Sequence, residues 1–163
     1  MPTVLLGLGS NLGRRQDHLR RALTALAEWL EITATSPVYE TAPMYVTDQP
    51  LFLNLVVRGE TEIAAAALLT RLKSLEAGLG RTASVRFGPR AIDLDILFYG
   101  RGVVATPTLT IPHPRLAERA FVLRPLADVA PHWTHPVTGR RVDEMLADLG
   151  ETPEVSLKYQ ALP

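Results

Sequence analysis

A short strand-like run that carries two aspartates limits the possible folds more than any other part of this sequence. Between Ile92 and Phe98, apolar residues alternate with Asp93, Asp95 and Leu97, and this period of two is typical of a strand with one face in a core. The two aspartates therefore share a face, roughly 6.6 Å apart along the strand. Because two anions that close repel each other, we expect one or two cations beside them.

The residues just before this strand favour a phosphate-handling site. Gly88-Pro89 indicates a rigid turn, and Arg90 offers a guanidinium that suits phosphate oxygens. Mg²⁺ held by carboxylates and substrate phosphates is the usual arrangement where phosphoryl groups are transferred. An exposed edge strand whose polar face happens to be acidic is the alternative for a bare Asp-x-Asp.

Residues 80–90 show no regular period and contain Arg81, Arg86 and Arg90. A segment of this composition has little apolar surface to bury, so we expect a mobile loop that closes over bound phosphates beside the aspartates. A flexible connector without a gating role is the alternative.

Length and charge narrow the class of protein. The 163 residues fit one domain, 1–163, and 47% of them are hydrophobic, enough for a sizeable core. The 17 basic and 17 acidic residues cancel, which argues against a nucleic-acid or anionic-membrane partner. The chain has no cysteine, no signal-peptide pattern and no apolar run of about 20 residues. We therefore expect a cytoplasmic protein, and a monomer.

The order of periodic segments predicts an α/β (α+β) domain with a ferredoxin-like βαββαβ core and C-terminal additions. The expected elements of the core are a strand at 3–8, a helix at 14–30, a strand at 32–41 with Pro37 at an edge or bulge, a strand at 51–57, a helix at 63–77 that Gly78 ends, and the strand at 92–98. After the core we expect short strands near 103–104 and 109–111, a terminal helix at 142–149, and a loosely held tail at 150–163.

Several single residues remain ambiguous on sequence alone. The motif GLGSNLG lacks the spacing of a dinucleotide fingerprint and favours a strand-to-helix turn. Asn54 interrupts an apolar strand and is either a core residue or a ligand reader. Glu76 near a helix C-terminus has a positive partner or is solvated, His113 between two prolines is suited to a phosphate oxygen, and the segment 42–50 is a candidate pocket wall.

Five motifs in the same order resemble one family, the hydroxymethyldihydropterin pyrophosphokinases of folate synthesis. They are GLGSN, ETAP with DQPLFLN, LEAGLGR, GPRAIDLDIL and IPHPRLAERAFVLRPL, spread over about residues 3 to 133. The resemblance implies a ferredoxin-like fold and transfer of diphosphate from ATP, with two Mg²⁺, to the hydroxymethyl group of 6-hydroxymethyl-7,8-dihydropterin, which gives AMP.

The resemblance also implies roles for individual residues. The implied Mg²⁺ ligands are Asp93 and Asp95, which with Arg81 and Arg90 form the catalytic group. The implied nucleotide contacts are Lys73, Glu76, Arg81, Arg86, Phe87, Arg90, Ile96, Thr110, His113 and Arg119. The implied pterin contacts are Thr41, Pro43, Met44 and Asn54 at the edge of the ring and Phe52 and Phe121 on its faces. The chain departs from some members of the family at Lys73, Phe87, Thr108 and Pro114.

Two other functions fit parts of the sequence. A non-catalytic domain that binds a small molecule would explain a pocket in this fold, but it gives no reason for an aspartate pair among arginines. A single-stranded nucleic-acid module would need sheet aromatics and a basic face, whereas the net charge is zero and 6% of residues are aromatic.

Overall fold

The computed structural model describes residues 1–43, 48–80 and 90–163. Its centre is an antiparallel sheet with the strand order β5-β1-β4-β3-β8, in which β2 also pairs with β4. The strands are β1 Thr3–Ser10, β2 Glu31–Thr35, β3 Val38–Thr41, β4 Phe52–Glu60, β5 Asp93–Tyr99 and β8 Val155–Tyr159, and a separate hairpin joins β6 Val104–Ala105 to β7 Thr110–Ile111.

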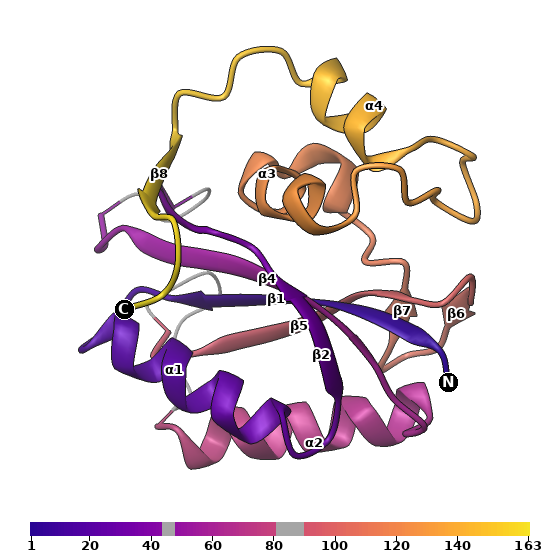
Figure 1. Cartoon of the computed structure of the whole chain (residues 1–163), viewed down its shortest axis with the longest axis horizontal. Coiled ribbons are helices and arrows are strands. Elements are labelled where there is room, and N and C mark those ends of the chain that lie inside the picture. Colours follow the sequence, from indigo (N-terminus) through magenta and orange to yellow (C-terminus); the bar gives the residue numbers. More distant parts are fainter. Residues whose placement is uncertain (44–47, 81–89) are drawn as a thin grey trace.

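Helices cover both faces of the sheet (Figure 1). On one face lie α1 (Arg15–Leu26) and α2 (Ala65–Gly78), and on the other lie α3 (Ala120–Val129), which follows a 3-10 turn at Leu116–Glu118, and α4 (Val142–Asp148). The strands β1, β4 and β5 with the helices α1 and α2 form the βαββαβ unit of the ferredoxin-like fold, completed by β2 and β3. The fold expected from the order of segments is confirmed. None of the described helices is long and apolar enough to cross a membrane.

Two apolar cores hold these layers together. Under α1 and α2, Leu19 and Leu72 pack with Leu6 and Leu8 of β1. Under α3 and α4, the second core gathers residues from the opposite face of the sheet, which are Leu5, Val56, Leu97, Phe98, Leu123, Leu126 and Val142. Each fully buried Leu or Phe contributes about 1.5–3 kcal/mol of transfer free energy, so the alternating pattern of β1 fixes which residues face which helices.

The alternation predicted for the aspartate strand is wrong at its end. Phe98 was expected to share a face with Leu94 and Ile96, but it packs in the core under α3. The pairing of β1 with β5 shifts between Leu5 and Leu6, so that Phe98 lies opposite Leu5 and Ile96 lies opposite Leu6. An extra residue at such a bulge turns the chain beyond it to the other face.

Several elements also differ from the sequence prediction, among them α1, which ends at Leu26 and not at residue 30. The expected strand at 32–41 is two strands, because the chain breaks at Pro37, which cannot donate to a ladder. Gly78 belongs to α2, and the left-handed residue after that helix is Gly80, with φ of 99°. The helix α3 was not predicted, since Pro125 interrupts its helical pattern.

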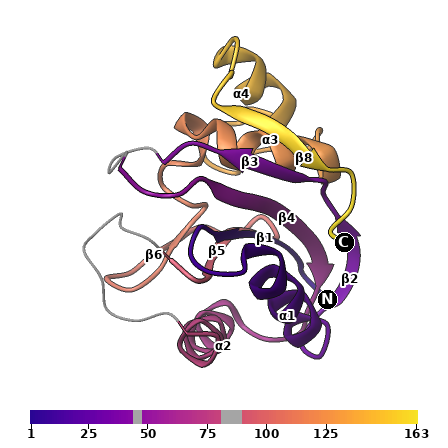
Figure 2. The ribbon, with the colours of Figure 1, turned by 90° about the vertical axis from the view of Figure 1, so that its left-hand side faces the viewer.

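The expected loose tail contains a paired strand. Residues of β8 lie opposite β3, with Thr41 facing Val155 in the register, and Figure 2 shows β8 along that edge of the sheet. Its side chains are mostly exposed, so the apolar periodicity that would signal a strand is absent. The backbone groups of β3 hold this segment in place.

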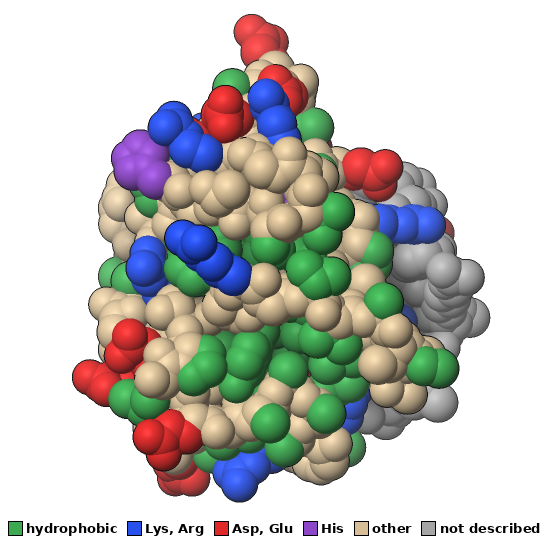
Figure 3. Space-filling model, turned by 90° about the vertical axis from the view of Figure 1, so that its right-hand side faces the viewer, with side chains coloured by type: hydrophobic (Ala, Val, Ile, Leu, Met, Phe, Trp, Pro, Cys, Tyr) green, Lys and Arg blue, Asp and Glu red, His purple; other side chains and the backbone are tan. Residues whose placement is uncertain are grey.

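The face with the β6–β7 hairpin exposes several apolar side chains (Figure 3). A shallow hollow there runs between the hairpin and α4, and Val103 and Val137 at its rim are more than half exposed. The hollow touches His113, which also lines the cavity described next.

Candidate active site

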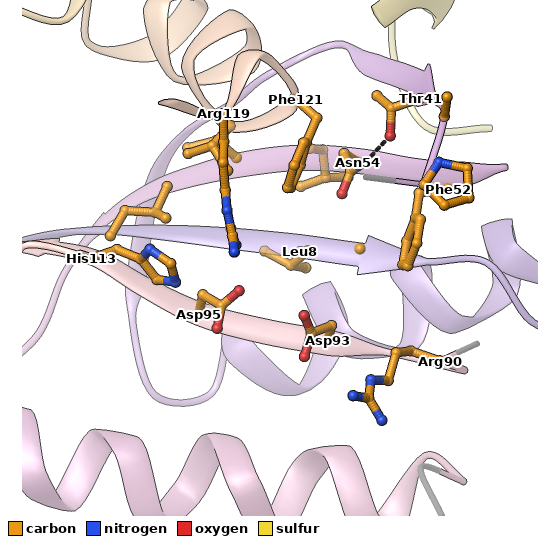
Figure 4. A pocket seen from close by; sticks show the side chains of 18 of the residues that line it. Leu8, Thr41, Phe52, Asn54, Arg90, Asp93, Asp95, His113, Arg119 and Phe121 are labelled. Atoms are coloured by element: carbon orange, nitrogen blue, oxygen red, sulfur yellow. Dashed lines mark hydrogen bonds between the residues drawn. The ribbon is translucent and has the colours of Figure 1, made fainter. Parts of the chain in front are cut away.

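A cavity of about 250 Å³ opens on the sheet face that carries α3. It lies over β1, β4 and β5, and the N-terminal end of α3 closes one side (Figure 4). Ten of the predicted site residues line it, which are Thr41, Pro43, Phe52, Asn54, Arg90, Asp93, Asp95, His113, Arg119 and Phe121. Residues up to 80 positions apart in the sequence thus meet at one place.

The floor of the cavity consists of two glycines of β1. Gly9 pairs with Asp93 on one side and with Asn54 on the other, and Gly7 pairs with Asp95. Because glycine has no side chain, nothing rises between the aspartates of β5 and the polar residues of β4. Asp93 and Asp95 point into the same space, as the period of two predicted (Figure 4).

The charge on Asp95 is unfavourable without a counterion. Burial raises the pKa of Asp95 to about 7, and repulsion from Asp93 adds to the rise, while Lys73 opposes it. A carboxylate in this state gains from any cation placed beside it. Among the described residues no group of three or more potential metal ligands occurs, and Mg²⁺ commonly takes further ligands from substrate phosphates and water.

We predict that Asp95→Asn makes the metal-free protein more stable above neutral pH. The folded chain holds the Asp95 proton up to its pKa of about 7, whereas the unfolded chain loses it near the ordinary aspartate pKa of 3.8. The folded state binds more protons in this window, so the free energy of unfolding falls as pH rises through it. The neutral variant avoids a loss on the order of 1–3 kcal/mol.

Thermal unfolding in a chelating buffer at about pH 8 and about pH 4 measures this effect. The variant is expected to unfold several degrees higher than the parent at the upper pH and at nearly the same temperature at the lower pH. If the variant and the parent have equal melting temperatures at both pH values, ionisation of Asp95 costs the folded chain no stability.

Two arginines and one histidine face the aspartates. Arg90 lies beside Asp93, and Arg119 and His113 lie beside Asp95 (Figure 4). The Arg119 guanidinium sits 5.6 Å from the centroid of the Phe121 ring. Its Nε is buried and has no hydrogen-bond partner in the described part of the chain, and buried donors of this kind normally have a partner. An anionic ligand would supply it.

His113 is neutral in this setting. Burial, together with the neighbouring Arg119, lowers the pKa of His113 to about 4. Its Nδ1 accepts a long hydrogen bond from the Arg115 backbone N–H at 3.4 Å, which leaves Nε2 to carry the proton. The ring is therefore a hydrogen-bond donor toward the cavity without adding charge.

The other end of the cavity is lined by two phenyl rings and a buried amide. The rings of Phe52 and Phe121 stand on two sides of the space in front of Asn54 (Figure 4). Asn54 is 8% exposed, and its Nδ2 donates to the Thr41 hydroxyl at 2.6 Å. That bond orients the amide and directs Oδ1 to the cavity. The geometry favours the ligand-reading interpretation of Asn54.

Glu76 has a clear partner, which resolves one ambiguity of the sequence. It is 2% exposed, and its carboxylate accepts the Leu94 backbone N–H at 2.8 Å and pairs with Lys73 at 3.3 Å. Since β5 is an edge strand, this bond satisfies an amide between the two aspartates. Glu76 therefore braces the aspartate strand from behind.

Some predicted nucleotide contacts do not line this cavity. Ile96 lies in the core under α1 and α2, Lys73 and Glu76 lie on α2, and Thr110 lies in the hairpin strand β7. Four predicted site residues, Met44, Arg81, Arg86 and Phe87, fall outside the described residues, as does most of the predicted gating loop.

Sequence reasoning missed the part played by Gly9. A Cβ atom on Gly9 would lie 2.7 Å from Asn54 Oδ1, closer than such atoms approach, whereas one on Gly7 would meet only the Leu97 side chain at 3.5 Å. The signal was present, because a glycine inside a strand often marks a close approach to a ligand or another chain segment. The motif GLGSNLG predicts that the strand ends at residue 8, whereas β1 continues through Gly9 to Ser10.

Comparison with known proteins identifies the family. A family model described as 7,8-dihydro-6-hydroxymethylpterin-pyrophosphokinase matches residues 5–131. A pyrophosphokinase of that substrate class from Aquifex aeolicus is 39% identical over 158 residues, which cover 97% of this chain and 95% of that one. The Bacillus subtilis protein of the same name is 41% identical and covers 85% of this chain and 84% of its own.

Longer relatives contain this chain as one part. The mitochondrial folate synthesis bifunctional protein of pea is 49% identical over 127 residues, and the match spans a quarter of its length. The solved structure of Plasmodium falciparum HPPK-DHPS with pteroate superposes with a TM-score of 0.74 at 18% identity, over 90% of this chain and 42% of that one, and shows the same fold. From the family match and the bacterial relatives, the chain belongs to the 7,8-dihydro-6-hydroxymethylpterin-pyrophosphokinase family.

Proposed function

We propose that the chain transfers the terminal diphosphate of ATP to the hydroxymethyl group of 6-hydroxymethyl-7,8-dihydropterin, a step of folate synthesis. The observation that carries the proposal is the cavity itself, which sets an aspartate pair and two arginines at one end and two phenyl rings with a buried amide at the other. The first end suits phosphates and the second suits a flat heterocycle. Membership of the family supports the choice of substrates.

Asp93 and Asp95 are the proposed ligands of two Mg²⁺ ions. Their oxygens are the donors that Mg²⁺ prefers, and burial together with repulsion from Asp93 raises the pKa of Asp95, an unfavourable charge that cations would offset. When bound, the ions neutralise charge on the transferring phosphates. Arg90 and Arg119 provide guanidinium groups at the same end, and His113 donates through Nε2.

The remaining residues place the pterin for attack. Phe52 and Phe121 hold the faces of the ring, and Asn54 and Thr41 read its polar edge. The hydroxymethyl oxygen then attacks the β-phosphorus of ATP and loses its proton to solvent. The bond from the β-phosphorus to the oxygen that it shares with the α-phosphate breaks. AMP leaves with the bridging oxygen, and the pterin carries the diphosphate.

The product of ATP tests this proposal. The chain is incubated with MgATP and the pterin, and nucleotides are separated by chromatography. AMP that appears in step with pterin consumption supports diphosphate transfer, whereas ADP would indicate transfer of a single phosphoryl group. We further propose a cytoplasmic monomer that needs no partner protein for this reaction; sedimentation at micromolar concentration tests its monomeric state.

We predict that Gly9→Ala weakens pterin binding by roughly tenfold or more, since a displaced buried hydrogen-bonding group costs about 1–3 kcal/mol. The new methyl group would force Asn54 away from its bond with Thr41. ATP binding is expected to change little.

Gly7→Ala is the matched control for this variant. Its methyl group would make ordinary contact with Leu97, so pterin affinity is expected to stay near that of the parent. Titration calorimetry with each substrate measures both variants. Equal losses in the two would argue that any side chain on β1 blocks the cavity and that Asn54 is not the group affected.

A further inference from the structure

Asn11 is a buried polar residue to which the proposed reaction gives no role. It follows β1 directly, belongs to the GLGSN motif and is 1% exposed. A buried amide requires acceptors for its two N–H groups and a donor for its oxygen. The positions of these partners reveal what the residue connects.

On one side Asn11 holds the backbone of Arg90 by two hydrogen bonds. The Asn11 backbone N–H donates to the Arg90 carbonyl at 3.0 Å, and Asn11 Oδ1 accepts the Arg90 N–H at 2.7 Å. Arg90 lies just before β5, with its side chain beside Asp93 (Figure 4). Asn11 thus fixes the start of the phosphate-binding end of the cavity.

On the other side Asn11 holds the segment that leads into β4. Its Nδ2 donates to Gln49 Oε1 at 2.8 Å and to the Pro50 carbonyl at 3.0 Å. Gln49 lines the cavity on the side of Phe52. The same side chain therefore contacts the wall of the pterin end.

Three of these four contacts, one on the Arg90 side and two on the Gln49 side, are made by the same planar side-chain amide. A turn of the amide by half a circle would place Nδ2 against the Arg90 N–H and Oδ1 against the oxygens of Gln49 and Pro50. The pairs with the Arg90 N–H and the Pro50 carbonyl would then be donor to donor and acceptor to acceptor, and each unsatisfied buried group costs about 1–3 kcal/mol. The side-chain contacts with Arg90 and with Pro50 therefore require the same orientation of the amide.

We propose that Asn11 is a positioning residue that couples the binding of the two substrates, an inference that rests on the proposed function. Phosphates that hold Arg90 also hold the Asn11 amide, and the amide in turn holds Gln49 and Pro50 in the pterin wall. The substrate that binds first orders the wall that the second substrate contacts. Binding of either substrate therefore raises the affinity of the chain for the other one. Linkage makes this effect reciprocal.

The test is a binding cycle. The dissociation constant of the pterin is measured by calorimetry in the presence and absence of an unreactive MgATP analogue, and the ratio of the two values is the coupling factor. The parent chain is expected to show a factor well above one, and Asn11→Ala to lower it by about fivefold or more. Pterin affinity without nucleotide is expected to change much less.

Two further variants sharpen the cycle. Asn11→Asp keeps the acceptor for the Arg90 N–H but places a carboxylate against the Pro50 carbonyl, so it should also lose coupling. Thr61→Val is the matched control, since Thr61 is 1% exposed and its hydroxyl donates to the Trp29 carbonyl at 3.2 Å, at the opposite end of β4. It is expected to lower the melting temperature and keep the coupling factor.

Three results of the binding cycle would contradict the role of Asn11. A coupling factor that is near one in the parent chain, unchanged in the Asn11 variants, or equally reduced in Thr61→Val overturns the inference. AMP formation by the same parent preparation shows whether the proposed function itself holds, so its absence would be a different failure. If Asn11→Ala does not fold, Gln49→Ala removes one of the contacts from a surface loop and is expected to reduce the coupling factor in the same direction.

Discussion

Asp95→Asn is expected to lower the rate of diphosphate transfer by about 10² or more at saturating Mg²⁺, with the fold intact. Asn keeps the shape of the side chain but removes the anion that binds the cation. The effect appears in kcat, because the charge that the cation neutralises develops as the bond to the β-phosphorus breaks. Steady-state assays of AMP formation over a range of Mg²⁺ concentrations measure it.

Asp93→Asn is expected to give a loss of the same order, since both carboxylates face the same space. Asp128→Asn provides a matched control, because Asp128 accepts the Tyr39 hydroxyl at 2.5 Å between α3 and β3 and does not line the cavity. That variant is expected to retain near-parental turnover. Normal turnover by either cavity variant at saturating Mg²⁺ would contradict the assignment of the metal site.

Replacing Phe52 or Phe121 by Ala is expected to weaken pterin binding by roughly 10- to 100-fold, the equivalent of about 1.5–3 kcal/mol for the buried contact of one ring. Each ring covers one face of the pterin, so neither can replace the other. ATP binding should change far less, although Arg119 packs over the Phe121 ring. Calorimetry with each substrate gives both numbers.

Phe52→Tyr and Phe121→Tyr are the conservative controls. Tyrosine keeps the aromatic face, so each is expected to restore most of the pterin affinity lost in the Ala variants. Equal losses of pterin and ATP binding in the Ala variants would show that these rings support the fold of the cavity and do not clamp the ligand.

Local periodicity predicted most of the fold. The spacing of Leu19 and Leu26 marked the buried side of α1, and the alternation around Asp93 and Asp95 placed both carboxylates on one face. It failed at the bulge before Phe98 and at β8, because both depend on which backbone lies alongside. Such pairing between distant segments leaves little trace in the pattern of a single strand.

The site likewise contains residues that the sequence indicates and residues whose roles depend on contacts between distant segments. The residues that carry charge or aromatic surface could be proposed from motifs, since the type of side chain itself indicates what it can bind. The roles of Gly9 and Asn11 were not predicted: a glycine within a strand signals a close approach without saying to what, here Asn54, and Asn11 joins Arg90 to Gln49 across 41 positions. Their roles exist only once the strands are assembled.

Following the β-phosphorus of ATP tests the central claim most directly. The chain is incubated with the pterin, Mg²⁺ and ATP labelled in its β-phosphate, and the labelled products are separated. The proposed reaction predicts that the label moves to the pterin, together with the γ-phosphate, and that AMP is unlabelled. Label that remains in ADP, or that is released as inorganic pyrophosphate at the same rate without pterin, would contradict it.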